Sequence, residues 1–437
     1  MPHFPGFVRR LREAARPYYL RHVFFRLFPE RRPAEFLRCW EPPHEFQGSA
    51  PTLEIPPPVP SLCDVLFLPM TDWHHRLQRT QRLALALAAL GHRCFLLNPH
   101  LGREYPSAPW PGRRPALARL DERVFEIHAP LPSEPVFHHR LLTPVESVAV
   151  AEALDWALRR AGVQRLALVL SLPTWLGAAL LLQQRWQATL VYDCHDWLPS
   201  LPGMAPSIAA AEPDAMRRSD LVLFCSRRLL AHLGGAMPEI GERTALVENG
   251  VPDWTPPSSP RTSQPVAGYI GAMERWFWVD AVVESARLLP DVRFTLFGAP
   301  HPRIRSAFSG LPNVVLPGEA PASQVPALLA GFRVGLLPRI GDQARFMAPI
   351  KIYEYFHYGL PVVAGPMPEL DRFGPLVYRA DTPAGFARAV AEALREQDPA
   401  MESARRSHAS HARWQHRAES LSRLLAGTAQ RRRRTSA

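Results

Sequence analysis

Residues 349–363 (PIKIYEYFHYGLPVV) carry the most closely spaced groups that can do chemistry. A helix is predicted to begin near Pro349, because proline is favoured in the first turn of a helix. The free backbone N–H groups of a helix start attract anions, and Lys351 would add a full positive charge there. Glu354 follows three residues later on the same face, where its carboxylate can accept ribose hydroxyls. The segment therefore predicts a site for a nucleotide diphosphate, the alternative being a surface Lys–Glu pair.

Lys351 is the only lysine among 51 basic residues; the others are arginine. Lysine is a compact point charge on a flexible stem, whereas arginine is a planar fork. A solvated pair in this chain would more readily have used arginine, so the exception favours a ligand-binding role. The net charge of +11 and the pI of about 10.0 indicate an anionic partner. Nucleic acid is not expected, because no helix-turn-helix, zinc-finger or RNA-binding signature occurs.

Two other short segments place polar residues directly after predicted strands. Asp193, Cys194, His195 and Asp196 follow the strand at 190–192. A histidine at a strand end is often structural, but one flanked by aspartates at the edge of an expected cleft favours a functional role. Asn249 and Gly250 follow the strand at 245–247. Such a pair is as often simply a turn, and both interpretations stay open.

The cysteines give no sign of a disulfide framework or a zinc cluster. They are odd in number, scattered and without a C-x-x-C pair, which fits a reducing compartment. They are Cys39, Cys63, Cys94, Cys194 and Cys225. We expect neither a signal peptide nor a membrane span, because residues 1–30 lack an uninterrupted apolar stretch and the most apolar window, 166–182, is short and interrupted.

Residues 1–60 are expected to form a separate extension. Aromatic and aliphatic residues alternate there with arginines, as in helices that lie on an anionic membrane surface. The alternative is one or two helices packed on the body with arginines facing water. Residues 51–60 (PTLEIPPPVP) are predicted to be a stiff proline-rich linker.

The rest of the chain reads as two α/β domains. Strands alternate with helices over 61–251 and again over 266–400, which predicts two doubly wound parallel sheets. The Pro- and Ser-rich segment 252–265 is the expected interdomain linker. A C-terminal helix is expected at 401–427, followed by a disordered basic tail at 428–437. Ligands of such sheets bind at the carboxyl ends of the strands, so two facing domains would enclose a cleft.

Several segments resemble, in the same order, retaining glycosyltransferases of the GT-B fold, family four. Besides 349–363, they are TDWHHRLQRTQRLALALAALGH, VYDCHDW, RRSDLVLFCSRRLL, VENGV, GYIGAMERWF, LPNVVLPGEAP and HARWQHRAESL. The resemblance covers about residues 61–425. The W…R-x-Q opening and the P-I-K-x-Y-E-Y segment look closest to enzymes of bacterial surface-polysaccharide assembly.

This resemblance implies roles for individual residues. The first domain would bind the acceptor and the second a nucleotide sugar. Lys351 would contact the donor diphosphate, and Glu354 would bind the ribose as the second glutamate of the family's Glu-x7-Glu pair. His195 and Asp196 would lie near the transferred sugar and, with Lys351, act in catalysis. The implied donor-binding residues are Gly271, Arg275, Pro349, Ile350, Lys351, Tyr353, Glu354, Asn249, Gly250 and Asp342.

The sequence departs from the family pattern at two places. Phe346 stands where the first glutamate would be, and Asp342 is the nearest upstream carboxylate. The usual Arg…Lys pair after the first strand of the donor domain is reduced to Glu274-Arg275, so Arg275 is expected to supply the second diphosphate charge.

The resulting hypothesis is a hexosyltransferase that moves a sugar from a nucleotide-diphosphate sugar to a glycan, lipid-linked or similar acceptor with retention. No metal or other cofactor is expected. The protein is expected in the cytoplasm, with the basic ends holding it on the inner face of the membrane. The alternatives are a GT-B sugar-nucleotide epimerase and a non-catalytic protein that binds nucleotide sugars.

Overall fold

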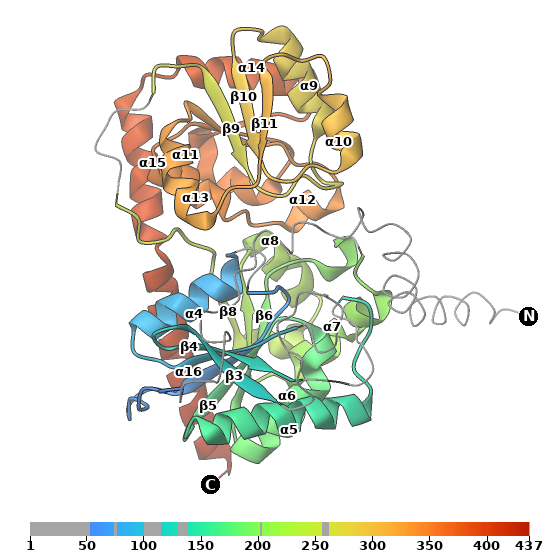
Figure 1. Cartoon of the computed structure of the whole chain (residues 1–437), viewed down its shortest axis with the longest axis vertical. Coiled ribbons are helices and arrows are strands. Elements are labelled where there is room, and N and C mark those ends of the chain that lie inside the picture. The colour runs from blue at the N-terminus through green and yellow to red at the C-terminus, as the bar shows by residue number, and fades with distance from the viewer. Residues whose placement is uncertain are drawn as a thin grey trace, which may run out of the picture.

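A computed structural model of the chain describes residues 53–73, 77–99, 115–129, 131, 138–201, 203–255 and 262–436. These residues form two α/β domains stacked one above the other (Figure 1). The expected extension lies outside the described residues up to position 52, as do linker positions 256–261. The arrangement confirms two doubly wound domains in tandem.

The N-terminal domain is built on an eight-stranded sheet in the order β3-β4-β2-β1-β5-β6-β7-β8. Every neighbouring pair is parallel except β3 with β4. The strands are β1 (Asp64–Leu68), β2 (Cys94–Leu97), β3 (Ala116–Asp121), β4 (Val124–His128), β5 (Leu166–Leu170), β6 (Thr189–Cys194), β7 (Leu221–Phe224) and β8 (Thr244–Leu246). The antiparallel edge pair β3–β4 was not anticipated.

Helices cover both faces of this sheet, because alternate residues of each buried strand point to opposite sides. In β1, Leu66 and Leu68 pack into the core beneath α5 (Pro144–Arg160), α6 (Leu176–Trp186) and α7 (Pro206–Arg218). Val65 and Phe67 instead pack beneath α4 (Arg79–Ala89) and α16 (Trp414–Ser436). The short α8 (Arg227–Leu229) follows β7.

The C-terminal domain has a six-stranded parallel sheet in the order β11-β10-β9-β12-β13-β14. This is the doubly wound order, with its switch point between β9 and β12. The strands are β9 (Val266–Ile270), β10 (Arg293–Phe297), β11 (Val314–Gly318), β12 (Val334–Leu337), β13 (Val362–Ala364) and β14 (Val377–Arg379). Its helices are α9 (Val279–Leu288), α10 (Pro302–Ala307), α11 (Val325–Ala330), α12 (Asp342–Phe346), α13 (Lys351–His357), α14 (Pro383–Arg395) and α15 (Pro399–His411).

The chain crosses between the domains twice, side by side. Residues after β8 lead into the C-terminal domain, and α16 returns along the N-terminal domain (Figure 1). The Val251 N–H donates to the Ala412 carbonyl at 2.8 Å, and the Trp414 N–H donates to the Val251 carbonyl at 3.0 Å. A Cβ on Gly250 would lie 2.6 Å from the Ala412 oxygen, so this position requires glycine for a close backbone approach.

The C-terminal end differs from expectation. The single helix predicted at 401–427 is two helices, α15 and α16, with a break at 412–413. The predicted disordered tail was wrong, because residues 428–436 continue α16. There Arg432 bonds both Asp220 oxygens at 2.6 Å, which ties the basic end to the N-terminal domain.

The described part of the proline-rich segment lies against the N-terminal domain instead of standing free as a spacer. Leu53 and Ile55 pack on its core, and backbone carbonyls of this segment accept hydrogen bonds from arginines of the domain. Among the described residues, no helix is both long and apolar enough to cross a bilayer.

Candidate functional site

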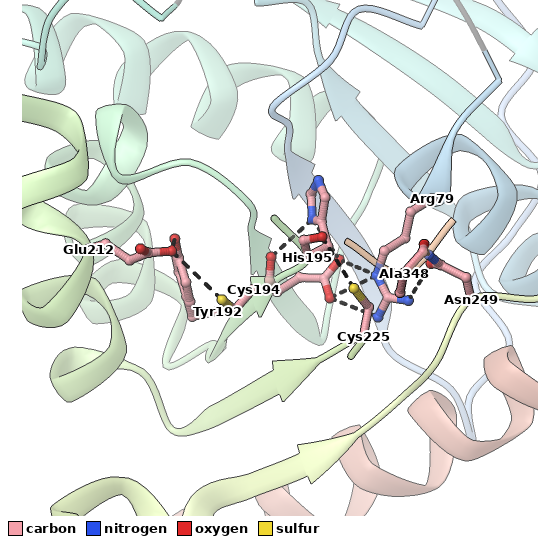
Figure 2. A network of polar contacts seen from close by, with 9 residues as sticks. Arg79, Tyr192, Cys194, His195, Glu212, Cys225, Asn249 and Ala348 are labelled. Atoms are coloured by element: carbon pink, nitrogen blue, oxygen red, sulfur yellow. Dashed lines mark hydrogen bonds and ion pairs between the residues drawn. The ribbon is translucent and has the colours of Figure 1, made fainter. Parts of the chain in front are cut away.

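The end of β6 presents polar groups to both faces of the N-terminal sheet. Tyr192 and Cys194 point to one side, toward Glu212 of α7, while Asp193 points to the other, toward Arg79 of α4 (Figure 2). This alternation follows from the two-residue period of a strand. His195 comes directly after the strand, which ends at Cys194.

Arg79, the first residue of α4, joins three separate segments. Its Nε donates to Asp193 Oδ1 and Oδ2 at 3.1 and 3.0 Å, and its Nη2 to Oδ1 at 2.9 Å. Its Nη1 donates to Asn249 Oδ1 at 3.1 Å. The Asn249 Nδ2 in turn donates to the carbonyl of Ala348 in the C-terminal domain at 2.8 Å. These contacts connect β6 to the loop that precedes Lys351.

His195 and Asp196 lie beside this network, where Figure 2 shows His195, and the His195 side chain is only 8% exposed. His195 Nδ1 is 3.1 Å from the Asp193 carbonyl oxygen and 3.5 Å from Asp193 Oδ2. Burial lowers the pKa of His195, but the hydrogen bond and charge of Asp193 outweigh it, so the net shift is upward. Burial raises the pKa of Asp196, against the charges of His195 and Arg339. The pair can exchange protons or hold a polar substrate group.

Glu212 is a buried carboxyl group behind the strand. It accepts a hydrogen bond from the Tyr192 hydroxyl at 2.8 Å and one from the Cys194 thiol at 3.7 Å. Burial raises its pKa to about 7, against the effects of these donors. Sequence reasoning missed this group, since a single glutamate in α7 has no distinguishing pattern.

Lys351 and Glu354 form a close pair in the first turn of α13. The Lys351 Nζ donates to Glu354 Oε2 at 2.5 Å, which confirms that the two side chains share one face of the helix. The Lys351 side chain is 24% exposed and that of Glu354 is 3% exposed. The negative charge of Glu354 also acts on Arg82 of α4, whose pKa is lowered by burial and raised by this charge. Both domains therefore supply cations around Glu354.

The helix starts later than the sequence predicted. Pro349 and Ile350 precede it, and α13 begins at Lys351. Pro349 is buried, and Ile350 packs on the core shared by α4 and α16 of the other domain. These two residues hold the loop against the N-terminal domain, while Lys351 stays accessible.

Tyr353 is placed away from Lys351. It is buried, packs edge-on against Phe373, and its hydroxyl accepts a hydrogen bond from Arg372 at 2.5 Å. Burial raises its pKa to about 12. These contacts give Tyr353 a packing role, and its predicted contact with the donor stays a prediction.

Gly271 and Arg339 lie at the switch point of the C-terminal sheet, after β9 and β12 respectively. A Cβ on Gly298, which ends the next strand, would lie 2.0 Å from the Gly271 carbonyl oxygen, so the backbones touch there. Arg339 is half-buried, its Nε has no hydrogen-bond partner among the described residues, and its charge acts on Asp196. Arg275, by contrast, is exposed. Arg339 is therefore a second candidate for the diphosphate cation that the sequence reasoning overlooked.

Phe346 and Asp342 lie at opposite ends of α12. Phe346 stacks on His232 of the N-terminal domain, with ring centroids 4.5 Å apart, and lies 4.9 Å from the Trp197 ring. Asp342 is exposed and forms an ion pair with Arg345 at 3.8 Å. The position of the missing glutamate thus forms an aromatic contact between the domains, beside Asp196.

A second polar contact joins the domains around α8. The Ser226 hydroxyl donates to Glu369 at 2.7 Å, and the backbone N–H of Arg228 donates to the same carboxylate at 3.0 Å. An acid of the C-terminal domain thus caps a helix of the other domain, a favourable place for negative charge. Within the described ranges, no group of three or more His, Cys, Asp or Glu side chains is placed to hold a metal ion.

Comparison with known proteins gives similar sequences and structures. Residues 264–396, the core of the C-terminal domain, match the family described as glycosyl transferases group 1. Sucrose-phosphate synthase from Thermosynechococcus elongatus has a TM-score of 0.66 at 15% identity, covering 83% of this chain and 98% of that chain. The Anabaena protein HepE, solved in complex with UDP and glucose, has a TM-score of 0.60 at 16% identity, covering 83% and 99%.

One curated relative also matches in sequence. A Bacillus subtilis (strain 168) protein, named as a teichuronic acid biosynthesis glycosyltransferase and called TuaH, is 25% identical over 231 residues. The match covers 47% of this chain and 58% of TuaH, so it spans about half of each protein. The chain therefore contains a domain that matches glycosyl transferases group 1, and its two domains have the arrangement of the GT-B fold seen in these solved structures.

Proposed function

We propose that the protein transfers a hexosyl group from a nucleotide-diphosphate sugar to a hydroxyl of a glycan or lipid-linked acceptor, with retention of configuration. The observation that carries the proposal is the pairing of two half-sites across the domain interface. Lys351 and Glu354 come from one domain and His195 and Asp196 from the other, and Arg79, Asn249 and Ala348 connect the segments that hold them.

In the proposed reaction, the donor diphosphate takes the Lys351 ammonium away from Glu354, and the ribose hydroxyls take the freed carboxylate. Lys351 and Arg339 then stabilise the charge that develops on the leaving diphosphate. The bond between C1 of the sugar and the diphosphate breaks as the acceptor oxygen bonds to C1 on the same face. The acceptor proton passes to the leaving phosphate. Because Lys351 and Arg339 already stabilise the negative charge of the leaving diphosphate, the proposed reaction requires no metal. Turnover in the presence of EDTA would therefore equal turnover in its absence.

Names of the related proteins narrow the substrate class. TuaH is named for teichuronic acid, and the HepE structure holds UDP and glucose. We propose a UDP-sugar as donor and a growing surface polysaccharide as acceptor. This proposal also places the enzyme on the cytoplasmic face of the membrane, with the basic residues of the segment before position 53 against anionic lipid.

The test is a thermal-shift screen of UDP-, GDP-, TDP- and ADP-sugars followed by product analysis. A donor at 100 times its dissociation constant adds about 2.7 kcal/mol of stability, which gives a measurable shift. NMR of the product made with that donor then reports the configuration at C1. An inverted product would contradict retention, and the absence of any shift would contradict the donor site.

Phe346 supports one alternative, a protein that binds nucleotide sugars without transferring them. Its ring occupies the position of the family glutamate and contacts the other domain. Thermal stabilisation by a nucleotide sugar, with no transfer to a panel of glycan and lipid-linked acceptors, would favour this alternative.

A further inference from the structure

Arg79 belongs to the R-x-Q segment that opens α4, yet the proposed reaction does not use it. It is 2% exposed, so it does not reach a ligand directly. It is nevertheless the one residue whose hydrogen bonds, among those described, reach both the strand before His195 and the loop residue that bonds to Ala348. Any role of Arg79 in the reaction must therefore act through the residues to which it bonds.

The planar guanidinium explains how one side chain does this. Its Nε and Nη2 face the Asp193 carboxylate, while Nη1 faces Asn249 at 3.1 Å. Asp193 is shared, because its Oδ2 is also 3.5 Å from His195 Nδ1. The chain of contacts therefore runs from the loop before Lys351, through Asn249 and Arg79, to the ring of His195.

A buried ion pair is in itself weak support for stability, because the cost of removing both charges from water can exceed their attraction. The same domain contains a matched case. Arg93 is also 2% exposed and bonds Asp64 at 2.8 and 2.6 Å, but at the opposite edge of the sheet. Its other acceptors are backbone carbonyls, among them Ala161 at 2.8 Å, within the same domain or its proline-rich segment. Arg93 therefore provides a control with equal burial and no link to the second domain.

We propose that Arg79 is a positioning residue that fixes His195 relative to Lys351 across the domain interface. The inference rests on the proposed transfer reaction. Productive transfer requires the two half-sites to be aligned, and a misplacement of about 1 Å can reduce a rate by about 100-fold. Lysine at this position keeps the charge beside Asp193 but lacks the fork that reaches Asn249 at the same time.

The experiment compares Arg79→Lys with Arg93→Lys under saturating donor and acceptor. Arg79→Lys is expected to lower kcat by about 10- to 100-fold, with the dissociation constant of the nucleotide sugar changed less than about threefold. It should also move the limb of the pH profile that reports His195. Arg93→Lys is expected to leave kcat and the profile unchanged. Equal kcat for Arg79→Lys and wild type, or equal losses in the two variants, would overturn the inference.

A double-mutant cycle that combines Arg79→Lys with Asn249→Ala tests whether the two residues act through the same chain of contacts. If the contacts act as one chain, Arg79→Lys with Asn249→Ala lowers kcat no more than the worse single change. Multiplying losses would overturn the inference. Should Arg79→Lys fail to fold, Asn249→Ala alone must lower kcat about 10-fold or more under saturating donor, and unchanged kcat would overturn the inference. Failure of the proposed function itself is distinguishable, because the unaltered protein would then transfer no sugar.

Discussion

The N-terminal sheet has a buried arginine–aspartate pair at each of the two ends of its strands. Arg93 and Asp64 lie at the amino ends of the strands, and Arg79 and Asp193 lie at the carboxyl ends. Burial is nearly equal, with all four residues between 1% and 4% exposed. Only the second pair contacts a group that reaches the other domain, Asn249.

The difference shows that the surroundings of an ion pair, and not its own geometry, decide whether it relates to function. In a parallel α/β sheet the carboxyl ends of the strands form the ligand-binding edge. The same two residue types hold β1 and β2 to the helix connections at the amino ends of the strands, and link β6 to the loop before Lys351 at the carboxyl ends. We expect changes to the pair at the amino ends of the strands to alter stability, and changes to the pair at the carboxyl ends to alter turnover.

The largest expected effect is at the amino edge. Arg93→Ala leaves Asp64 buried without its partner and should lower the free energy of unfolding by about 3–5 kcal/mol. Urea denaturation followed by tryptophan fluorescence measures this. The control is Arg159→Ala, which removes a pair whose arginine is 65% exposed and should cost at most about 1 kcal/mol. Equal losses in the two variants would contradict a dominant role of burial.

For Lys351 the main expected effect is on turnover. Lys351→Ala should lower turnover by about 10²–10³-fold, since it removes one strong donor to the leaving diphosphate. The unfolding free energy should also fall, because Lys351→Ala leaves the buried Glu354 without its partner, so turnover is compared under conditions in which both proteins are folded. Lys351→Arg should also be impaired, because a planar fork does not replace a point charge in a tight turn. Steady-state kinetics measure both, with the exposed Arg305→Ala as control; near-normal turnover of Lys351→Ala would rule out the assignment.

Glu212, behind the carboxyl end of β6, is expected to make the stability of the fold depend on pH. Its pKa is raised from 4.5 to about 7, so the folded state binds a proton that the unfolded state releases. The stabilising contribution of protonated Glu212 is therefore fully present below about pH 4.5 and is lost as the pH rises through about 7. Glu212→Gln should remove this loss, which amounts to about 3 kcal/mol by pH 8. His195 titrates in the same direction, so the variant must be compared with wild type at each pH.

Urea denaturation at pH 5, 6, 7 and 8 provides the measurement for Glu212. The exposed Glu242→Gln serves as control and should follow the wild-type curve. If the curves of wild type and Glu212→Gln stay parallel from pH 5 to 8, the carboxyl group does not titrate in this range and the prediction is wrong.

The smallest expected effect concerns the aromatic contact between the domains. Phe346→Leu removes the ring stacked on His232, and such pairs contribute about 0.5–1.5 kcal/mol beyond their buried area. A double-mutant cycle with His232→Leu, read by urea denaturation, measures the coupling. Strictly additive losses would show that the two rings do not interact in solution.

Much of the fold was predictable because buried parallel strands are short apolar runs bounded by polar or turn residues. The strand predicted at 190–192 lies inside β6, and the strand predicted at 245–247 overlaps β8. The strands β3, β4 and β14 were missed because their pattern is shorter or less apolar, and pairing with a neighbour defines them. The tail was misjudged because Arg432 is held by Asp220, which lies 212 residues away in the sequence.

The sequence by itself determined the class of fold and the two neighbouring charged groups of one half-site. A lone lysine at a helix start, with a glutamate three residues later, is a local pattern, and helix geometry alone brings the two groups together. Arg79, Glu212 and Arg339 could not be chosen in this way, because no local spacing distinguishes them from many similar residues. Their roles depend on which strand ends meet and on how the domains face each other, and only tertiary packing decides both.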